Sequence, residues 1–143
     1  MKLKYSLIIF IIIFVGFALY GYFKSIPGLE DSTEKHPIIE AVPDFFDFGD
    51  LEYGDLAEHT FKIKNSGEEV LEIKRLSTSC ACTSAEIEKE ALSPGEEVNL
   101  FVKYNTGLMT GDHAKGNQER IIYIKSNDPI NPQIEITIKA YVK

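Results

Sequence analysis

The chain has 143 residues, of which 22 are acidic and 15 are basic, so its formal net charge is -7. This length allows one ordinary domain, and the acidic balance excludes the clustered basic face that nucleic-acid binding requires. The chain lacks Trp but is rich in Ile, Val, Phe and Tyr, a composition typical of β-structure and not of a disordered protein.

The N-terminus carries an uncharged apolar run from Tyr5 to Phe23, after a short basic segment at residues 1–4. As a helix, this run would measure about 28 Å, close to the roughly 30 Å hydrocarbon core of a bilayer. We therefore predict a transmembrane signal anchor at residues 5–23 that contacts membrane lipid. Lys2 and Lys4 place the N-terminus in the cytoplasm and the C-terminal domain in the periplasm or outside the cell.

A cleaved signal peptide is the alternative interpretation of this segment. Cleavage needs small residues in an A-x-A-like pattern after an apolar stretch of about 7–15 residues. The stretch here is longer, and the best candidate site, Leu19-Tyr20-Gly21, begins with a bulky residue. The sequence therefore favours the anchor, and cleavage stays the open alternative.

Residues 24–42 contain Pro27 and Pro37 and show neither helical nor strand periodicity, so they predict a flexible tether. His36 falls within this tether, where we expect it to be solvated. After Val42 the chain alternates between strand patterns and turn signals at intervals of about 8–12 residues. This spacing is typical of an antiparallel sandwich.

The region 43–143 is expected to form seven strands and no soluble helix. Apolar and polar residues alternate along the expected strands, as in Ile134, Ile136 and Ile138 of the last one, whose side chains should point inward. The sequence thus predicts an all-β fold, a seven-stranded immunoglobulin-like sandwich preceded by one N-terminal transmembrane helix. The expected strands are residues 45–49, 59–64, 70–76, 83–88, 98–104, 121–125 and 134–142.

Short motifs follow one another in a distinctive order along this region. They are Phe46-Asp47-Phe48-Gly49, Asn65-Ser66-Gly67, Ser79-Cys80-Ala81-Cys82-Thr83, Pro94-Gly95-Glu96 and Ser126-Asn127-Asp128-Pro129. The ordered set resembles the bacterial family called domain of unknown function 1573, which is similar in turn to immunoglobulin-like domains of sperm proteins and pilus chaperones. The resemblance implies a sandwich fold and an envelope location, and no agreed biochemical activity. Two features depart from the family: Ala81 stands where Gly is usual, and the stretch 106–116 is longer and richer in His and Met.

The only cysteines, Cys80 and Cys82, are the main candidates for chemistry. In extended backbone their Cα atoms would lie about 6.5–7 Å apart, at or beyond the limit for an unstrained disulfide, and a turn at Ala81 would shorten this distance. Three states stay open: a disulfide, a free dithiol and a two-thiolate metal site. An oxidising compartment favours the disulfide, which could be structural or could act as a redox centre.

A metal site would need further donors, and the loop at residues 106–116 supplies Met109 and His113 with i, i+4 spacing. Soft thiolate and thioether ligands suit monovalent copper, so Cys80, Cys82, Met109 and His113 form the candidate copper-binding set. The alternatives are a core-filling role for Met109 and a solvated loop position for His113. The CxC spacing lacks the CxxC pattern of tetrahedral zinc sites.

Sequence motifs of catalysis are missing, because the chain has no GxSxG elbow, Walker loop, HExxH or GxGxxG. His59 lies on an expected strand, where it should face solvent without a functional role. We therefore predict a non-enzymatic, membrane-anchored module that acts in protein–protein interaction or envelope assembly, with another envelope protein as its partner. Strand addition to a sheet edge is the expected binding mode. A copper-binding or thiol-redox domain built on the cysteine pair is the alternative.

Overall fold

The computed structural model describes residues 13–22, 35–111 and 114–143. The chain divides into two units, residues 1–34 and residues 35–143. In the first unit, residues 13–22 form a helix whose large apolar side chains are exposed. Among the described residues no helix is long and apolar enough to cross a bilayer. Of the expected anchor at residues 5–23, only residues 13–22 are among the described residues.

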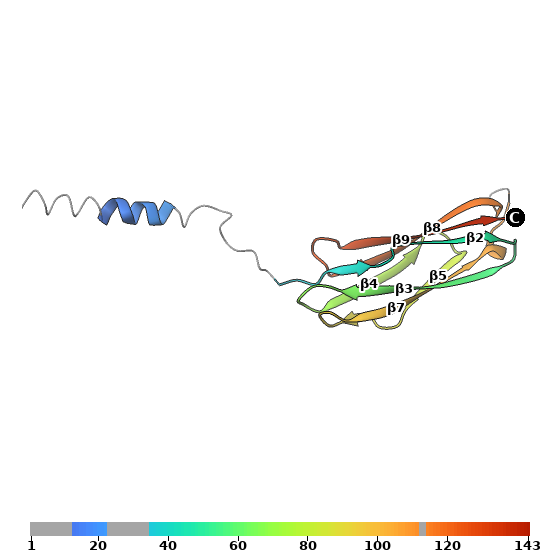
Figure 1. Ribbon diagram of the computed structural model, residues 1–143, viewed down its shortest axis with the longest axis horizontal. Helices are drawn as coiled ribbons and strands as arrows, with labels where there is room; N and C mark the ends of the chain where they lie inside the picture. Colours follow the sequence, from blue (N-terminus) through green and yellow to red (C-terminus); the bar gives the residue numbers. More distant parts are fainter. Residues whose placement is uncertain (1–12, 23–34, 112–113) are drawn as a thin grey trace, which may run out of the picture. The chain divides into compact units, whose positions relative to one another are not determined.

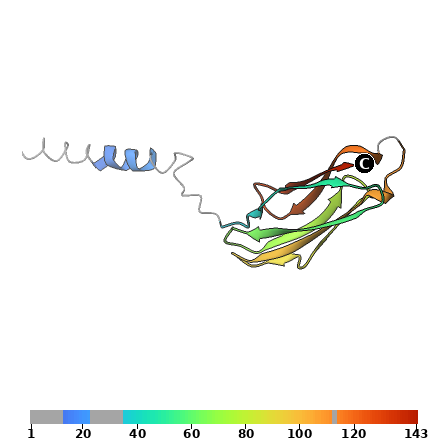
Figure 2. The ribbon, with the colours of Figure 1, turned by 45° about the vertical axis from the view of Figure 1, so that its right-hand side comes forward.

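The second unit is a sandwich of two β-sheets packed face to face (Figures 1 and 2). Sheet A has the strand order β1-β3-β7-β5, and sheet B has the order β2-β9-β8-β4-β6. Neighbouring strands are antiparallel except β2 and β9, which are parallel. The strands are β1 (Ile39–Ala41), β2 (Phe45–Leu51), β3 (Leu56–Asn65), β4 (Leu71–Thr78), β5 (Thr83–Ile87), β6 (Ala91–Leu92), β7 (Glu97–Asn105), β8 (Gly116–Ser126) and β9 (Gln133–Val142), and a 3-10 turn follows β7 at Thr106–Leu108.

The strand count corrects the sequence-based expectation, because the described residues form nine strands instead of seven. The seven expected strands correspond to β2, β3, β4, β5, β7, β8 and β9. The two that were missed, β1 and β6, have three and two residues and are too short to show an alternation of two. The expected end of the tether was also wrong, since residues 35–42 belong to the domain, Pro37 is buried and β1 pairs with β3.

The core lies between the two sheets and consists of the inward rows of their strands. In β9, Ile136, Ile138, Ala140 and Val142 are buried as the alternation predicted, whereas Ile134 is only partly buried. The central strand β8 contributes Ile122 and Ile124, both fully buried. Burial of one such side chain is worth about 1.5–3 kcal/mol, so these rows hold the two sheets together.

Two histidines differ from the sequence-based expectation. His59 is half-buried in the inward row of β3 and stacks on Phe46, with ring centroids 3.6 Å apart. Burial lowers the pKa of His59, so the imidazole is neutral at pH 7. The period of two that turns Phe61 inward also turns His59 inward. His36 is half-buried within the domain and is not a solvated tether residue.

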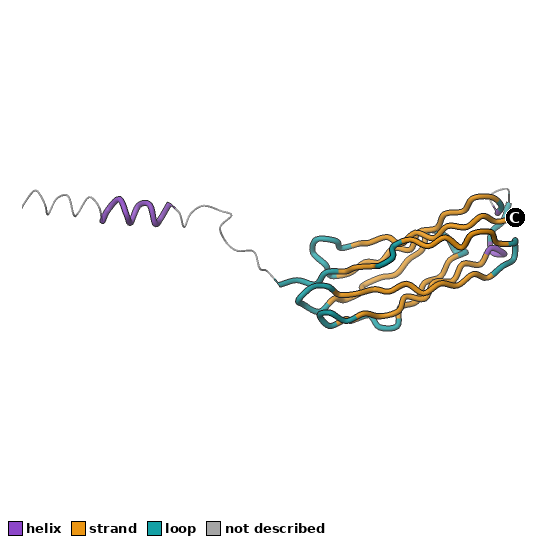
Figure 3. The backbone as a smooth tube through the Cα atoms, in the orientation of Figure 1, coloured by secondary structure: helices purple, strands orange, loops and turns teal. Residues whose placement is uncertain are grey.

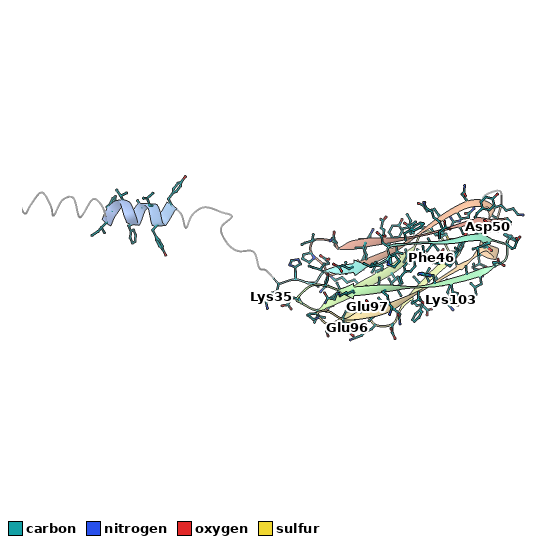
Figure 4. All side chains as sticks on the ribbon, in the orientation of Figure 1. Lys35, Phe46, Asp50, Glu96, Glu97 and Lys103 are labelled. Carbon is teal, nitrogen blue, oxygen red and sulfur yellow. A yellow bond between two sulfur atoms is a disulfide. The ribbon has the colours of Figure 1, made fainter. Side chains whose placement is uncertain are left out.

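Loops gather at the two ends of the sandwich (Figure 3). Lys35, Glu96 and Glu97 mark one end and Asp50 lies near the other (Figure 4). We call the second end the distal tip and define it as residues 52–56, 79–82 and 105–111. Backbone hydrogen bonds join these loops, from Asn105 N to Cys82 O at 2.8 Å and from Thr106 N to Asp55 O at 2.9 Å. The distal tip therefore brings the cysteine pair beside the loop that contains Met109.

Candidate functional site

The turn between β4 and β5 carries a disulfide between Cys80 and Cys82. The two Cα atoms are 5.3 Å apart, less than extended backbone would give, because the chain turns at Ala81. Thr83 N donates to Cys80 O at 3.3 Å, and Thr78 Oγ1 lies 3.0 Å from the same oxygen. Cys82 is buried whereas Cys80 is only partly buried, so the two sulfur atoms occupy different environments.

Arg120 on β8 is the residue of this site that sequence reasoning missed. It shares the inward row of β8 with Gln118 and Ile122 and is half-buried. Its Nε donates to Cys82 Sγ at 3.2 Å, and its Cζ lies 5.9 Å from the centroid of the Tyr104 ring. The available signal was a cation in the inward row of a strand that otherwise supplies the core.

Among the described residues, Arg120 donates only to neutral acceptors. Nη2 donates to Met109 Sδ at 3.0 Å and to Gln118 Oε1 at 2.6 Å, and Nη1 donates to Glu119 O at 2.7 Å. No carboxylate among the described residues forms an ion pair with Arg120. Buried cations are normally paired with anions. In the part of the chain that the structure describes, a guanidinium without a carboxylate partner therefore lies next to a sulfur atom that can become an anion on reduction.

Three of the four candidate copper ligands lie in this region, and His113 lies outside the described residues. Met109 Sδ accepts hydrogen bonds from the Tyr104 hydroxyl at 3.3 Å and from Arg120 at 3.0 Å. Burial raises the pKa of Tyr104 against the opposing effect of Arg120, so the hydroxyl keeps the proton that it donates. The same guanidinium contacts both Cys82 Sγ and Met109 Sδ, where it repels a metal cation.

The donors of the described residues therefore do not fit a copper ion in the disulfide form. Outside residues 112–113, the domain also contains no cluster of three or more His, Cys, Asp or Glu side chains that could hold a metal ion. The Met109 side chain is buried, and its sulfur accepts a hydrogen bond. Met109 therefore packs the core at this end of the sandwich.

Three large apolar side chains are exposed at the distal tip. Tyr53, Leu56 and Leu108 are 49%, 58% and 62% exposed. The loops that carry them are fixed in place, since the Tyr53 hydroxyl donates to Met109 O at 3.0 Å. This end of the domain therefore exposes three large apolar side chains, the kind of surface that interaction sites often use.

The edge of β5 is a second candidate feature, and it begins at the disulfide turn. β5 is the last strand of sheet A and pairs only with β7, in a regular register over five residues. Glu88 N donates to Asn99 O at 3.0 Å, and Asn105 N donates to Cys82 O at 2.8 Å. The backbone groups of Cys82 and Glu88 therefore point toward β7. Alternation along an antiparallel strand then turns the N–H and C=O groups of Ala85 and Ile87 away from β7.

The other three edges offer less to an added strand. β1 and β6 have only three and two residues. The register between β2 and β9 is broken between Asp47 and Asp50, where Gly49 adopts a φ of 69°. Short and irregular edges are common devices against unwanted pairing, so β5 is the longest regular edge available.

A shallow pocket of about 220 Å³ adjoins β5 on sheet A. Phe101, which lines it, is 41% exposed, and the Lys103 ammonium pairs with a Glu58 carboxylate at 3.0 Å. The pocket thus combines an apolar ring with charges of both signs. The residues that line it are Glu58, His59, Thr60, Glu86, Phe101, Val102 and Lys103.

Solved structures with similar folds come from several kinds of protein. A protein of unknown function from Porphyromonas gingivalis W83 has a TM-score of 0.67 and 22% identity, over 82% of this chain and 51% of that chain. PapD-like domain 7 of human CEP192 has a TM-score of 0.53 and 10% identity, over 73% and 84%. The secreted serine protease VesC from Vibrio cholerae has a TM-score of 0.52 and 13% identity, over 78% and 24%. This chain thus spans about half of the Porphyromonas protein and about a quarter of the protease.

At these identities the structural likenesses show the fold alone, an immunoglobulin-like or PapD-like sandwich. No curated protein matches the chain. A family model described as "Protein of unknown function (DUF1573)" matches residues 39–142, which includes β1 and extends to the penultimate residue. This match confirms the resemblance carried by the ordered motifs. The chain belongs to the DUF1573 family of proteins of unknown function.

Proposed function

We propose that the domain is a non-catalytic interaction module that binds an extended segment of another envelope protein by strand addition to β5. The open edge of β5 is the observation that carries this proposal, because Ala85 and Ile87 present backbone donors and acceptors in regular register. In this binding mode, main-chain hydrogen bonds supply affinity and neighbouring pockets select side chains. The pocket beside Glu86 and Phe101 is placed to receive an outward side chain of the added strand.

Replacement of Ala85 by proline tests this binding mode. Proline removes the N–H group that faces the open edge and leaves the β5–β7 hydrogen bonds in place. We expect the affinity for extended peptides, selected from a random library on the full-length chain in detergent, to fall at least tenfold. A tenfold loss corresponds to about 1.4 kcal/mol, the magnitude of one or two hydrogen bonds. Fluorescence anisotropy with the labelled peptides measures the change.

The matched control is Ala85→Ser, which alters the side chain but keeps the N–H group. We expect it to bind the selected peptides as the unmodified chain does. If the proline variant stays folded and retains the full affinity, the peptides bind elsewhere and strand addition to β5 is wrong. A failure to select any peptide above background contradicts the proposal as well.

We also infer that residues 5–23 anchor the chain in a membrane and that the domain lies outside the cytoplasm. The uncharged run with its basic N-terminal flank supports the anchor. An intramolecular disulfide suits an oxidising compartment, which is compatible with the outer location. The partner would then be another protein of the cell envelope.

A reporter enzyme that is active only outside the cytoplasm, fused after Lys143, checks this topology. We expect activity in the membrane fraction, and loss of activity when residues 5–23 are deleted. Activity confined to the soluble fraction, with a mature N-terminus near Tyr22, would instead demonstrate cleavage of the segment. An inactive fusion of the complete chain would contradict the outer location.

A second candidate function is favoured by one contact, the hydrogen bond from Arg120 Nε to Cys82 Sγ. It supports the thiol-redox alternative over the copper alternative, because a guanidinium stabilises a thiolate and repels a metal cation. For this reason, we do not propose a copper site.

A further inference from the structure

We propose that Cys80 and Cys82 form a thiol–disulfide exchange site that accepts two electrons from the dithiol of a partner protein. In this site Arg120 stabilises the Cys82 thiolate that is released. The proposal goes beyond strand addition, which binds a partner without any change in covalent bonds.

The two sulfur atoms have different environments, and this difference gives the reaction a direction. Cys80 is partly buried at the turn, whereas Cys82 is only 6% exposed and its Sγ accepts the Arg120 Nε–H at 3.2 Å. In exchange, a thiolate attacks one sulfur and the other departs, and a leaving thiol of lower pKa departs faster. A neighbouring arginine lowers the pKa of a cysteine. Attack therefore occurs at Cys80, and Cys82 departs.

The charge balance of the site favours its reduced form. The disulfide offers Arg120 a neutral sulfur, and no carboxylate among the described residues pairs with this guanidinium. Reduction converts the same contact into a hydrogen bond between two charged groups, which is roughly twice as strong as a neutral one. Thr83 Oγ1 lies 3.5 Å from Cys80 Sγ and 3.9 Å from Cys82 Sγ, where it can donate a further hydrogen bond.

The reaction balances with the partner dithiol as the only co-reactant. A partner thiolate attacks Cys80 Sγ, a mixed disulfide forms, and the Cys80–Cys82 bond breaks with its electron pair on Cys82 Sγ. The second partner thiol loses its proton to solvent and attacks the partner sulfur of the mixed disulfide. Cys80 departs and takes up a proton. The partner loses two electrons and becomes a disulfide, and the cysteine pair gains both.

The surroundings of the pair suit a polypeptide substrate. Tyr53, Leu56 and Leu108 expose apolar surface on the same tip of the domain. β5, whose edge is open at Ala85 and Ile87, begins at Thr83, directly after Cys82. A partner segment in contact with this end would bring its cysteine toward Cys80, the more accessible of the two.

The rate of disulfide reduction by dithiothreitol tests the role of Arg120. We expect Arg120→Gln in the full-length chain to slow reduction at pH 7 roughly tenfold, because the departing Cys82 thiolate loses its cationic partner. Arg120→Lys keeps the charge and should retain most of the rate. Arg75→Gln, the same substitution at an exposed arginine of β4, should leave the rate within about twofold. Equal rates for the two glutamine variants, both shown to be folded, would overturn the proposal.

Two further measurements do not depend on the stability of an Arg120 variant. Limiting reduced glutathione, added to the unmodified chain and trapped by alkylation, should be found on Cys80 by peptide mass mapping, with the alkyl group on Cys82. Glutathione on Cys82 would overturn the assignment of the leaving group. In Cys80→Ser, the ultraviolet absorbance of the Cys82 thiolate should titrate below the ordinary thiol pKa of about 8.5; titration at or above that value would contradict stabilisation by Arg120.

These outcomes are separate from those of strand addition. Dithiothreitol and glutathione are too small to need the β5 edge, so Ala85→Pro should reduce at the rate of the unmodified chain. Loss of peptide binding with unchanged exchange kinetics in Ala85→Pro supports strand addition, whereas retained binding rejects strand addition alone. The exchange site is rejected by the Arg120 and glutathione outcomes above, whatever Ala85→Pro binds.

Discussion

Replacement of Ile136 by alanine is expected to lower the free energy of unfolding by about 2–5 kcal/mol. Ile136 has no exposed surface, and across the β8–β9 pair it lies opposite Ile122, which has none either. The substitution removes buried methyl and methylene groups and leaves a cavity between sheets whose strands are held by their hydrogen-bond ladders. Because the surroundings can collapse only partly, the cavity adds to the lost burial. Chemical denaturation monitored by circular dichroism measures the change.

Thr137→Ala is the matched control, because the neighbouring residue on β9 projects from the opposite face of sheet B. Thr137 is half-buried, and its backbone N–H bonds to Asp44 O, which the substitution leaves intact. We expect a loss of no more than about 1 kcal/mol. Similar losses at both positions would mean that β9 does not alternate between core and surface, and the register of sheet B would be wrong.

The strands that were predicted correctly share a physical property: each is long enough for an alternation of two to repeat. β7 and β9 show it over nine and ten residues, and both are buried on the expected face. β1 and β6 have only three and two residues. Their position depends on backbone pairing with β3 and β4, to which side-chain patterns contribute little. Such short edges cannot be recognised from local sequence.

The candidate site also has one part that the sequence could predict and one part that it could not. The pairing of Cys80 with Cys82 is local, and its turn could be anticipated from the spacing. The contact with Arg120 joins residues 38 positions apart and depends on the register that β8 adopts in sheet B. Sequence could have indicated only that Arg120 occupies an inward position. Its partners follow from the way that the two sheets close at the distal tip.

Asp128 shows how a turn motif can have a role that its local pattern does not reveal. The motif Ser126-Asn127-Asp128-Pro129 leads into the turn between β8 and β9, and only 1% of the surface of Asp128 is exposed. Its carboxylate accepts hydrogen bonds from Ile39 N at 3.0 Å, Ile130 N at 2.8 Å and Asn131 N at 2.9 Å. It therefore holds the turn and also ties β1 to the rest of the domain.

Replacement of Asp128 by alanine is expected to cost roughly 3–5 kcal/mol of stability, because three backbone donors lose a charged acceptor. Burial alone would raise the pKa of Asp128, but the hydrogen bonds from Asn131, Ile39 and Ile130, together with nearby His36, lower this pKa by more than burial raises it. The net pKa lies below the ordinary value of about 3.9. The folded state thus releases this proton more readily than the unfolded state does.

The sign of the pH dependence follows from this lowered pKa. The stabilisation by Asp128 is fully present above the unfolded pKa near 4 and is lost as the pH falls through the folded pKa. Asp128→Asn tests it, since an amide keeps one oxygen acceptor but turns an NH₂ group toward a backbone donor. We expect the variant to be about 1–3 kcal/mol less stable at pH 7, and the gap to narrow by pH 3 in urea denaturation. Glu96 also has a lowered pKa, through its hydrogen bonds with Lys89 and Ser93. Because Glu96 is present in both the unmodified chain and Asp128→Asn, its contribution cancels from the difference in stability. A gap that stays constant from pH 7 to pH 3 would show that the charge of Asp128 does not contribute, and that only the shape of its side chain holds β1 in place.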